Sequence, residues 1–198
     1  MRREPRPIYP APPRPIQQPG DGYKPTSFYD LPAELRIEIY KLALENVIIH
    51  ILPPTARDKA APHSLIRTSK MIRNEVLPII HSTCKIRSTV TDFNFAGLLE
   101  FIARIPPDEE ACLLKNANLS IQLCTSADPA GSLESLRKWL KYRGDKCRPQ
   151  PHWRYSGPRP STKVQNDLRR RAKRMTELNK KEELKVMMKA LDVRNVEY

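Results

Sequence analysis

The stretch that most constrains the fold is residues 28–45, FYDLPAELRIEIYKLALE, because it has the pattern of one helix with two apolar stripes. Asp30 offers a carboxylate that caps free backbone N–H groups, and Pro32 suits a first helical turn, where its missing N–H is no loss. The apolar residues of the two stripes are Leu31, Leu35, Ile39 and Leu42, and Ile37, Tyr40 and Leu44. Because so wide an apolar surface needs cover from two directions, we expect this helix in a core or in an interface.

Apolar patterns predict further strands and helices up to residue 125. β-Branched residues crowd residues 47–52 and 85–90, and apolar residues alternate over 117–123, so each stretch is expected to be a strand. Helical spacing predicts one helix from residue 64, kinked or interrupted at Pro78, and another that ends before Pro106. We therefore expect a small α+β domain over residues 28–125, with about three helices and a short antiparallel sheet.

The two flanks differ from this stretch in charge and in proline content. Formal charges give +3 for residues 1–27, zero for residues 28–125 and +10 for residues 126–198. The first flank holds eight of the twenty prolines, so a disordered leader is expected; the three-residue spacing of Pro7, Pro10 and Pro13 also fits a polyproline II ligand.

After Thr125 the sequence predicts three segments. We expect a short helix over residues 126–143 that docks on the core, a linker over 144–161 and a basic helical tail over 162–198. The apolar positions of the tail change phase between Leu178 and Leu184, which favours two amphipathic helices over one continuous coiled coil.

Composition excludes several classes of protein. The start, MRREPRP, has no apolar stretch behind it, so no secretory signal is expected. No run approaches the roughly 18 apolar residues of a membrane-spanning helix. We therefore expect a nuclear or cytoplasmic protein without a membrane partner. Four cysteines without a CxxC pair are predicted to be free thiols: Cys84, Cys112, Cys124 and Cys147.

No catalytic motif is recognisable. The sequence has no G-x-S-x-G elbow, no Gly-rich phosphate loop and no HExxH. We expect no enzymatic activity, no cofactor and no metal site. An enzymatic alternative would require two of His50, His63 and His81, or one of them and an acid, to converge in a pocket.

Cations cluster in LRRRAKRM, residues 168–175. The cluster consists of Arg169, Arg170, Arg171, Lys173 and Arg174. Such a cluster fits the acidic groove of a nuclear import receptor or the phosphates of a nucleic acid. The simpler alternative is a solvated helix face, which is what charge runs usually form.

Aromatic residues interleave with cations between residues 139 and 155. Trp139, Tyr142, Trp153 and Tyr155 lie among five lysines and arginines, the combination that single-stranded nucleic acid requires for stacking and phosphate contact. The alternative is that these rings anchor a helix and the following linker on the core.

Two blocks of the sequence resemble a known family. The Leu-Pro-x-Glu-Leu opening at residues 31–35, followed by Arg36 and Ile39, resembles the start of an F-box, and it is most similar to fungal F-box-like proteins with a Glu-x-Arg motif. Residues 64–83 resemble the second block of that family at Lys70, Ile72, Arg73, Glu75, Leu77 and Pro78. The resemblance covers about residues 28–125.

The resemblance implies a protein that binds proteins. It implies a docking surface for the F-box-binding adaptor of a cullin ubiquitin ligase, at Leu31, Pro32, Leu35 and Ile39. The alternative is that these residues are ordinary core. We therefore expect a non-enzymatic interaction protein, either a subunit of a ubiquitin ligase or a stand-alone binding module. The alternative function is that of a nuclear protein that binds nucleic acid through its basic C-terminal region.

Overall fold

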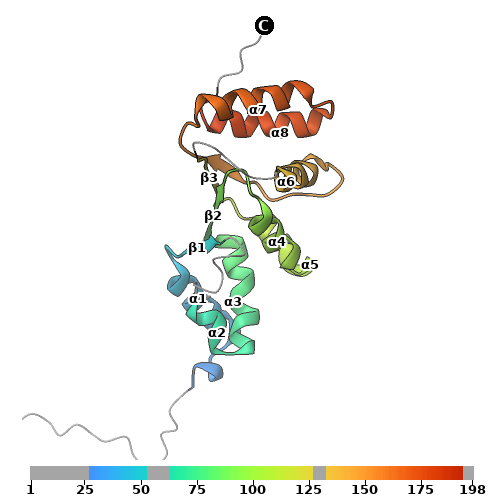
Figure 1. Cartoon of the computed structure of the whole chain (residues 1–198). Coiled ribbons are helices and arrows are strands. Elements are labelled where there is room, and N and C mark those ends of the chain that lie inside the picture. The colour runs from blue at the N-terminus through green and yellow to red at the C-terminus, as the bar shows by residue number, and fades with distance from the viewer. Residues whose placement is uncertain (1–26, 53–62, 127–132, 194–198) are drawn as a thin grey trace, which may run out of the picture. The chain divides into compact units, whose positions relative to one another are not determined.

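The structure is a computed structural model that describes residues 27–52, 63–126 and 133–193 (Figure 1). The predicted disordered leader and its proline repeat lie outside the described residues, except for Ser27. The chain divides into two units, one up to Arg36 and one from Ile37 onward, and each unit is described by itself.

A short 3-10 helix opens the described part of the first unit. This helix, η1, spans Phe28–Asp30 and has a capping box: the Ser27 N–H donates to Asp30 Oδ2 at 2.8 Å, and Ser27 Oγ accepts from the Tyr29 N–H. The Asp30 carboxylate thus caps a free backbone N–H, as expected, but it does so within the 3-10 turn that precedes the long helix. Arg36 is buried and donates to the carbonyl oxygens of Tyr29 and Leu31.

Along the chain, one helix precedes the first strand and two helices follow it. Helix α1 spans Ala33–Leu44, α2 spans Ser64–Thr68 and α3 spans Lys70–Thr83. The sequence predicts one helix from residue 64, but Ser69 is extended and its Oγ accepts from the Ile72 N–H at 3.2 Å, so it caps a separate helix. Pro78 lies inside α3 and does not interrupt it.

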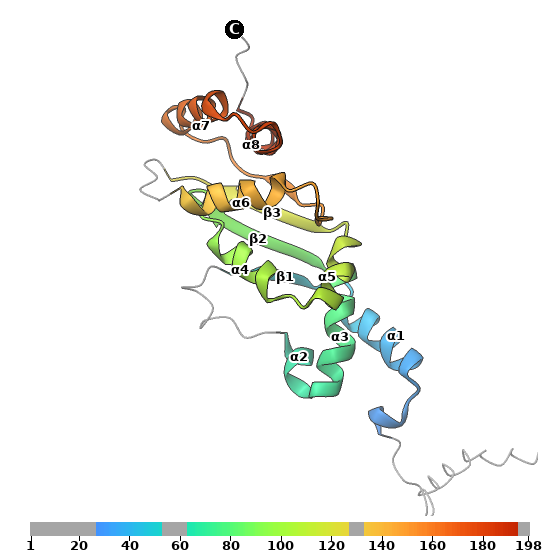
Figure 2. The same ribbon diagram turned by 90° about the vertical axis from the view of Figure 1, so that its right-hand side faces the viewer.

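Four strands form one parallel sheet in the described part of the chain. They are β1 (Ile48–Ile51), β2 (Lys85–Thr91), β3 (Leu119–Cys124) and β4 (Arg154–Ser156), in the order β1-β2-β3-β4. Every neighbouring pair is parallel, with Ser88 opposite Ile121 and Ile121 opposite Tyr155 (Figure 2). The prediction of a small three-helix domain with an antiparallel sheet is wrong: the described residues form eight α-helices and this parallel sheet.

The connections explain why the strands run in parallel. Helices α2 and α3 join β1 to β2, α4 (Ala96–Arg104) and α5 (Pro107–Leu114) join β2 to β3, and α6 (Glu134–Gly144) joins β3 to β4. A helical crossover returns the chain to the end of the sheet from which it left, so the next strand takes the same direction. The acidic run at residues 108–110 occupies the first turn of α5, where the helix dipole favours negative charge.

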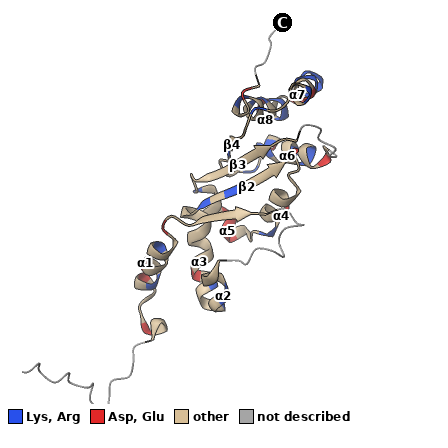
Figure 3. Ribbon diagram, turned by 60° about the vertical axis from the view of Figure 1, so that its left-hand side comes forward, with Lys and Arg blue, Asp and Glu red and all other residues tan. Residues whose placement is uncertain are grey.

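The two faces of the sheet have different surroundings. Alternate residues of β2 and β3 are buried on the face that α4, α5 and α6 cover (Figure 2). Alternate residues of the opposite face are exposed or half-buried, among them Lys85, Arg87, Ser120, Gln122 and Arg154. Figure 3 shows this second face in front of the helices. A parallel sheet usually has both faces covered, so one polar face without a described helix on it is uncommon.

The basic C-terminal region is part of the core. Helices α7 (Thr162–Arg174) and α8 (Leu178–Ala190) are two separate amphipathic helices, as the phase change predicts. Their apolar residues belong to the same cluster of buried side chains as the sheet: Val164, Leu168, Ala172, Leu184, Met187 and Met188. The expected linker contains β4. The core thus extends from Ile51 to Val193, and the structure differs here from the expected domain that ends near Thr125 and continues in a tail.

Candidate functional site

Helix α1 has apolar side chains on two sides, and only one side is buried. Tyr40 and Leu44 are 1% and 4% exposed. Leu35, Ile39 and Leu42 are 53%, 42% and 70% exposed, and their spacing of four and three residues places them along one line of the helix. We call these three residues the α1 stripe. Within the described residues the fold covers one side of this helix and leaves the α1 stripe exposed, so of the two expected locations only an interface remains for that side.

The predicted partner-binding residues are largely accessible. Pro32, Leu35 and Ile39 are exposed, and Leu31 is half-buried. Leu42 is the most exposed large apolar residue of the helix, and the prediction did not include it among the partner-binding residues. The sequence could have indicated Leu42, because helical spacing places it on the same line as Leu35 and Ile39.

The buried side of α1 holds the helix in place. The Tyr40 hydroxyl donates to Glu75 Oε2 of α3 at 2.9 Å. Ile72, Val76 and Ile80 of α3 are buried as well. An exposed apolar line on an anchored helix is a preformed surface, and such surfaces mark sites of protein–protein contact when they are contiguous.

The predicted import or phosphate-binding cluster lies on α7. Arg170, Lys173 and Arg174 are exposed, while Arg169 and Arg171 are half-buried. Arg171 Nε lies 2.7 Å from Asp167 Oδ2. Since the opposite side of α7 is in the core, a receptor that takes this segment in extended form would first have to separate α7 from that core.

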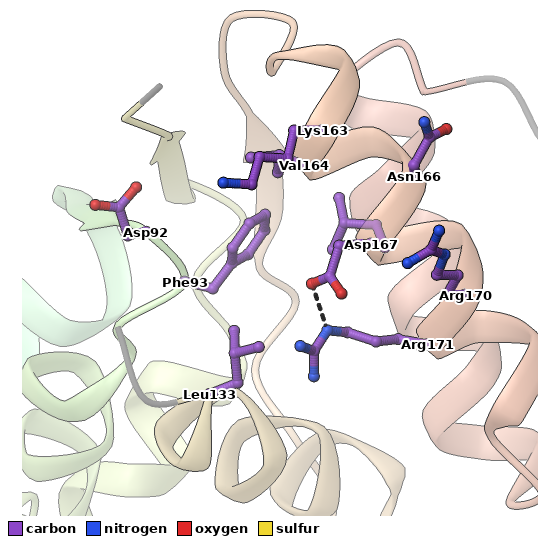
Figure 4. Close-up of a pocket in the computed structure, with 10 residues that line it drawn as sticks. Asp92, Phe93, Leu133, Lys163, Val164, Asn166, Asp167, Arg170 and Arg171 are labelled. Carbon is purple, nitrogen blue, oxygen red and sulfur yellow. Dashed lines mark hydrogen bonds and ion pairs between the residues drawn. The ribbon is translucent and has the colours of Figure 1, made fainter. Parts of the chain in front are cut away.

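Two neighbouring hollows follow the line of α7. The first, of about 440 Å³, lies between α7 and the segment of Asp92 and Phe93 (Figure 4). The second, of about 460 Å³, lies between α6 and the C-terminal half of α7. Both volumes lie in the range of ligand-binding pockets.

The aromatic residues predicted as stacking platforms are inside the fold. Trp139 and Trp153 are 0% and 3% exposed, and Tyr142 and Tyr155 are half-buried. Trp139 stacks on Phe95 with 5.1 Å between ring centroids. The structure thus agrees with the alternative in which these rings anchor α6 and the following segment.

A polar network joins α6, β4 and α8. Trp139 Nε1 donates to the Tyr155 hydroxyl at 2.9 Å, and that hydroxyl donates to Glu183. Arg143 Nε lies 2.9 Å from Glu183 Oε1, with both side chains 13% exposed. Burial, and next the Glu183 carboxylate, raise the pKa of Tyr155 well above its usual value, so this phenol stays protonated.

One histidine meets an acid, but in the interior. His81 Nδ1 of α3 lies 2.9 Å from Glu109 Oε2 of α5, and the histidine side chain is 8% exposed. Burial lowers the pKa of His81 below 6.5, although Glu109 acts in the opposite direction. His50 is exposed and His63 is half-buried. The His81–Glu109 pair joins two helices and is closed to a substrate.

Metal-ligating side chains do not gather in the part of the chain that the structure describes. No group of three or more His, Cys, Asp or Glu residues there is placed to hold a metal ion. The four cysteines are free thiols in the described structure, from buried Cys84 to exposed Cys147. Within the same residues, every helix is too short or too polar to cross a membrane.

Comparison with protein-family models, with curated proteins and with solved structures gives no match.

Proposed function

We propose that this chain is a non-enzymatic interaction protein of the nucleus or cytoplasm that binds a partner protein through the α1 stripe. One observation carries the proposal: Leu35, Ile39 and Leu42 are exposed together on a helix whose other side is anchored by Tyr40 and Leu44. Isolated exposed apolar residues are common on protein surfaces, whereas a line of three on one helix matches the helix-in-groove mode of recognition.

The F-box-binding adaptor of a cullin ubiquitin ligase is the partner that we propose. The Leu-Pro-x-Glu-Leu opening, which resembles an F-box, ends at Leu35, and Ile39 follows one turn later. Leu35 and Ile39 thus belong both to the resemblance and to the exposed α1 stripe. Apolar anchors at the centre of such an interface typically contribute about 2–4 kcal/mol each.

A binding measurement with the purified adaptor tests this proposal. We expect the full chain to bind the adaptor, and we expect the double substitution Ile39→Ser and Leu42→Ser to raise the Kd by about 30-fold or more, which corresponds to about 2 kcal/mol. Isothermal titration calorimetry on both proteins measures the difference.

A matched control uses exposed apolar residues elsewhere on the chain. Leu178 and Val186 of α8 are 66% and 52% exposed, so Leu178→Ser and Val186→Ser remove a similar apolar area away from α1. We expect this double variant to bind the adaptor as the unchanged protein does. No binding by the unchanged protein, or an equal loss in both double variants, would contradict the proposal.

A further inference from the structure

The two hollows along α7 form one groove. They share Leu133, Asp167, Arg170 and Arg171, so they are neighbours along the same helix. Helix α7 has 13 residues, which corresponds to a length of about 20 Å. The groove therefore has the length of a peptide segment and exceeds what a single small molecule fills.

The C-terminal half of the groove is strongly basic. Its lining includes four arginines, Arg137 from α6 and Arg170, Arg171 and Arg174 from α7, and one acid, Asp167. The formal charge of this lining is thus +3. Asp167 pairs with Arg171, and among the described residues neither Arg170 nor Arg174 has an acidic partner. Guanidinium groups from two helices leave several donors available for carboxylates.

The floor of the groove is apolar. Leu136, Leu140 and Leu184 are buried beneath it, while Leu133 and Met175 are half-buried at its sides. An occupant gains the most from this lining if it carries negative charges together with an apolar side chain that reaches the floor.

We infer that this groove binds an acidic peptide segment of a partner protein, with aspartate or glutamate residues on the arginines and an apolar residue toward Leu133 and Met175. Single-stranded nucleic acid fits less well, because it gains much of its affinity from stacking on accessible aromatic rings. Phe93, the aromatic residue that lines the first hollow, is only 4% exposed, and Trp139 is buried. The groove does not involve the α1 stripe, so this inference is independent of the proposed adaptor binding.

Fluorescence anisotropy of the full chain with a labelled probe tests the inference. The probe is a synthetic peptide with four Glu-Leu-Asp repeats. We expect the substitutions Arg170→Ala and Arg174→Ala together to raise its Kd by about tenfold or more, because they remove two of the charge-assisted contacts. A second peptide with glutamine and asparagine in place of the acids should bind at least tenfold more weakly.

A control pair of lysines separates a local effect from general charge attraction. Lys185 and Lys189 of α8 are exposed and do not line the groove, so Lys185→Ala and Lys189→Ala remove the same total charge elsewhere. We expect less than a twofold change in Kd for this variant. Circular dichroism melting curves of both double variants should match that of the unchanged protein, because all four side chains are exposed.

Three results would overturn the inference. The first is an absence of probe binding, and the second is an equal loss of affinity in the two double variants. The third is that an oligothymidine of twelve nucleotides binds more tightly than the peptide probe and loses affinity when Arg170 and Arg174 are replaced. The last result would identify a nucleic-acid site. The variant with both Arg170→Ala and Arg174→Ala should bind the adaptor as the unchanged protein does. A negative result for the peptide groove is therefore distinguishable from a negative result for adaptor binding.

Discussion

At the scale of single residues, burial decides what the polar groups of this chain do. His81 and Glu109 have the chemistry of an acid–base pair, yet the His81 side chain is 8% exposed and the pair joins α3 to α5. Asn116, in the loop after α5, holds the C-terminal end of α3: its Nδ2 donates to the carbonyl oxygens of His81 and Cys84 at 2.8 and 2.9 Å. These groups position helices, so their substitution is expected to alter stability.

The free energy of unfolding should fall as the pH is lowered through and below 6.5, because of His81. Burial lowers the pKa of His81 in the folded protein, so the unfolded chain binds a proton more readily in that range and is favoured by acid. Urea unfolding at about pH 7.5 and about pH 5.5 measures the effect. The decrease in unfolding free energy between these two pH values should be smaller in His81→Asn. It should be unchanged in His50→Gln, because His50 is exposed. A stability that rises on acidification would show that the Glu109 charge outweighs burial.

At the scale of helices and strands, the sequence predicts the elements better than their arrangement. The strands over residues 48–51, 85–91 and 119–124 agree with those predicted over 47–52, 85–90 and 117–123 from alternating or β-branched apolar residues. The change of phase predicts two C-terminal helices, but the break lies between Arg174 and Leu178, a few residues before the predicted position. The strand β4 was missed because it has three residues and only Tyr155 among them is apolar. The parallel direction was missed although strands and helices alternate along the predicted chain, which is typical of parallel sheets.

Candidate sites were predictable to a similar degree. The residues Pro32, Leu35 and Ile39 were identified from the Leu-Pro-x-Glu-Leu pattern, but their exposure was not, because two apolar sides of a helix are equally compatible with a core. The groove between α6 and α7 was not predictable, since Arg137 and Arg174 are 37 positions apart and meet only through the packing of two helices.

Gly157 tests the close packing at the end of β4. A Cβ atom at this position would lie 2.2 Å from the Leu123 carbonyl oxygen and 2.9 Å from Leu191 Cδ2. We therefore expect Gly157→Ala to lower the free energy of unfolding by about 1–3 kcal/mol or more. Gly144→Ala is the control, because its nearest neighbour is the flexible side chain of Lys180 at 3.1 Å, and a change within about 0.5 kcal/mol is expected. Equal stability of the two variants would contradict the packing of β4 between β3 and α8.

At the scale of the whole molecule, the second unit combines one core with two surfaces of different chemistry, the groove along α7 and the exposed Ile39 and Leu42 of the α1 stripe. The core cluster includes residues from β1 to the end of α8, so the basic C-terminal region is a structural part of this unit. Its charges lie on folded helices, where Figure 3 shows lysines and arginines along α7 and α8. The α1 stripe is apolar, whereas the groove along α7 is basic. The two surfaces are therefore suited to different partners.

The central claim is that the α1 stripe is a surface for a partner and contributes little to the core. Chemical denaturation of the full chain with Leu35→Ser, Ile39→Ser and Leu42→Ser together tests it directly, with Leu44→Ala as the buried reference. We expect the triple variant to lose less than about 1 kcal/mol of unfolding free energy and the reference to lose about 2–5 kcal/mol. A loss of more than about 4 kcal/mol in the triple variant would mean that the stripe is covered within the fold, and it would contradict the account.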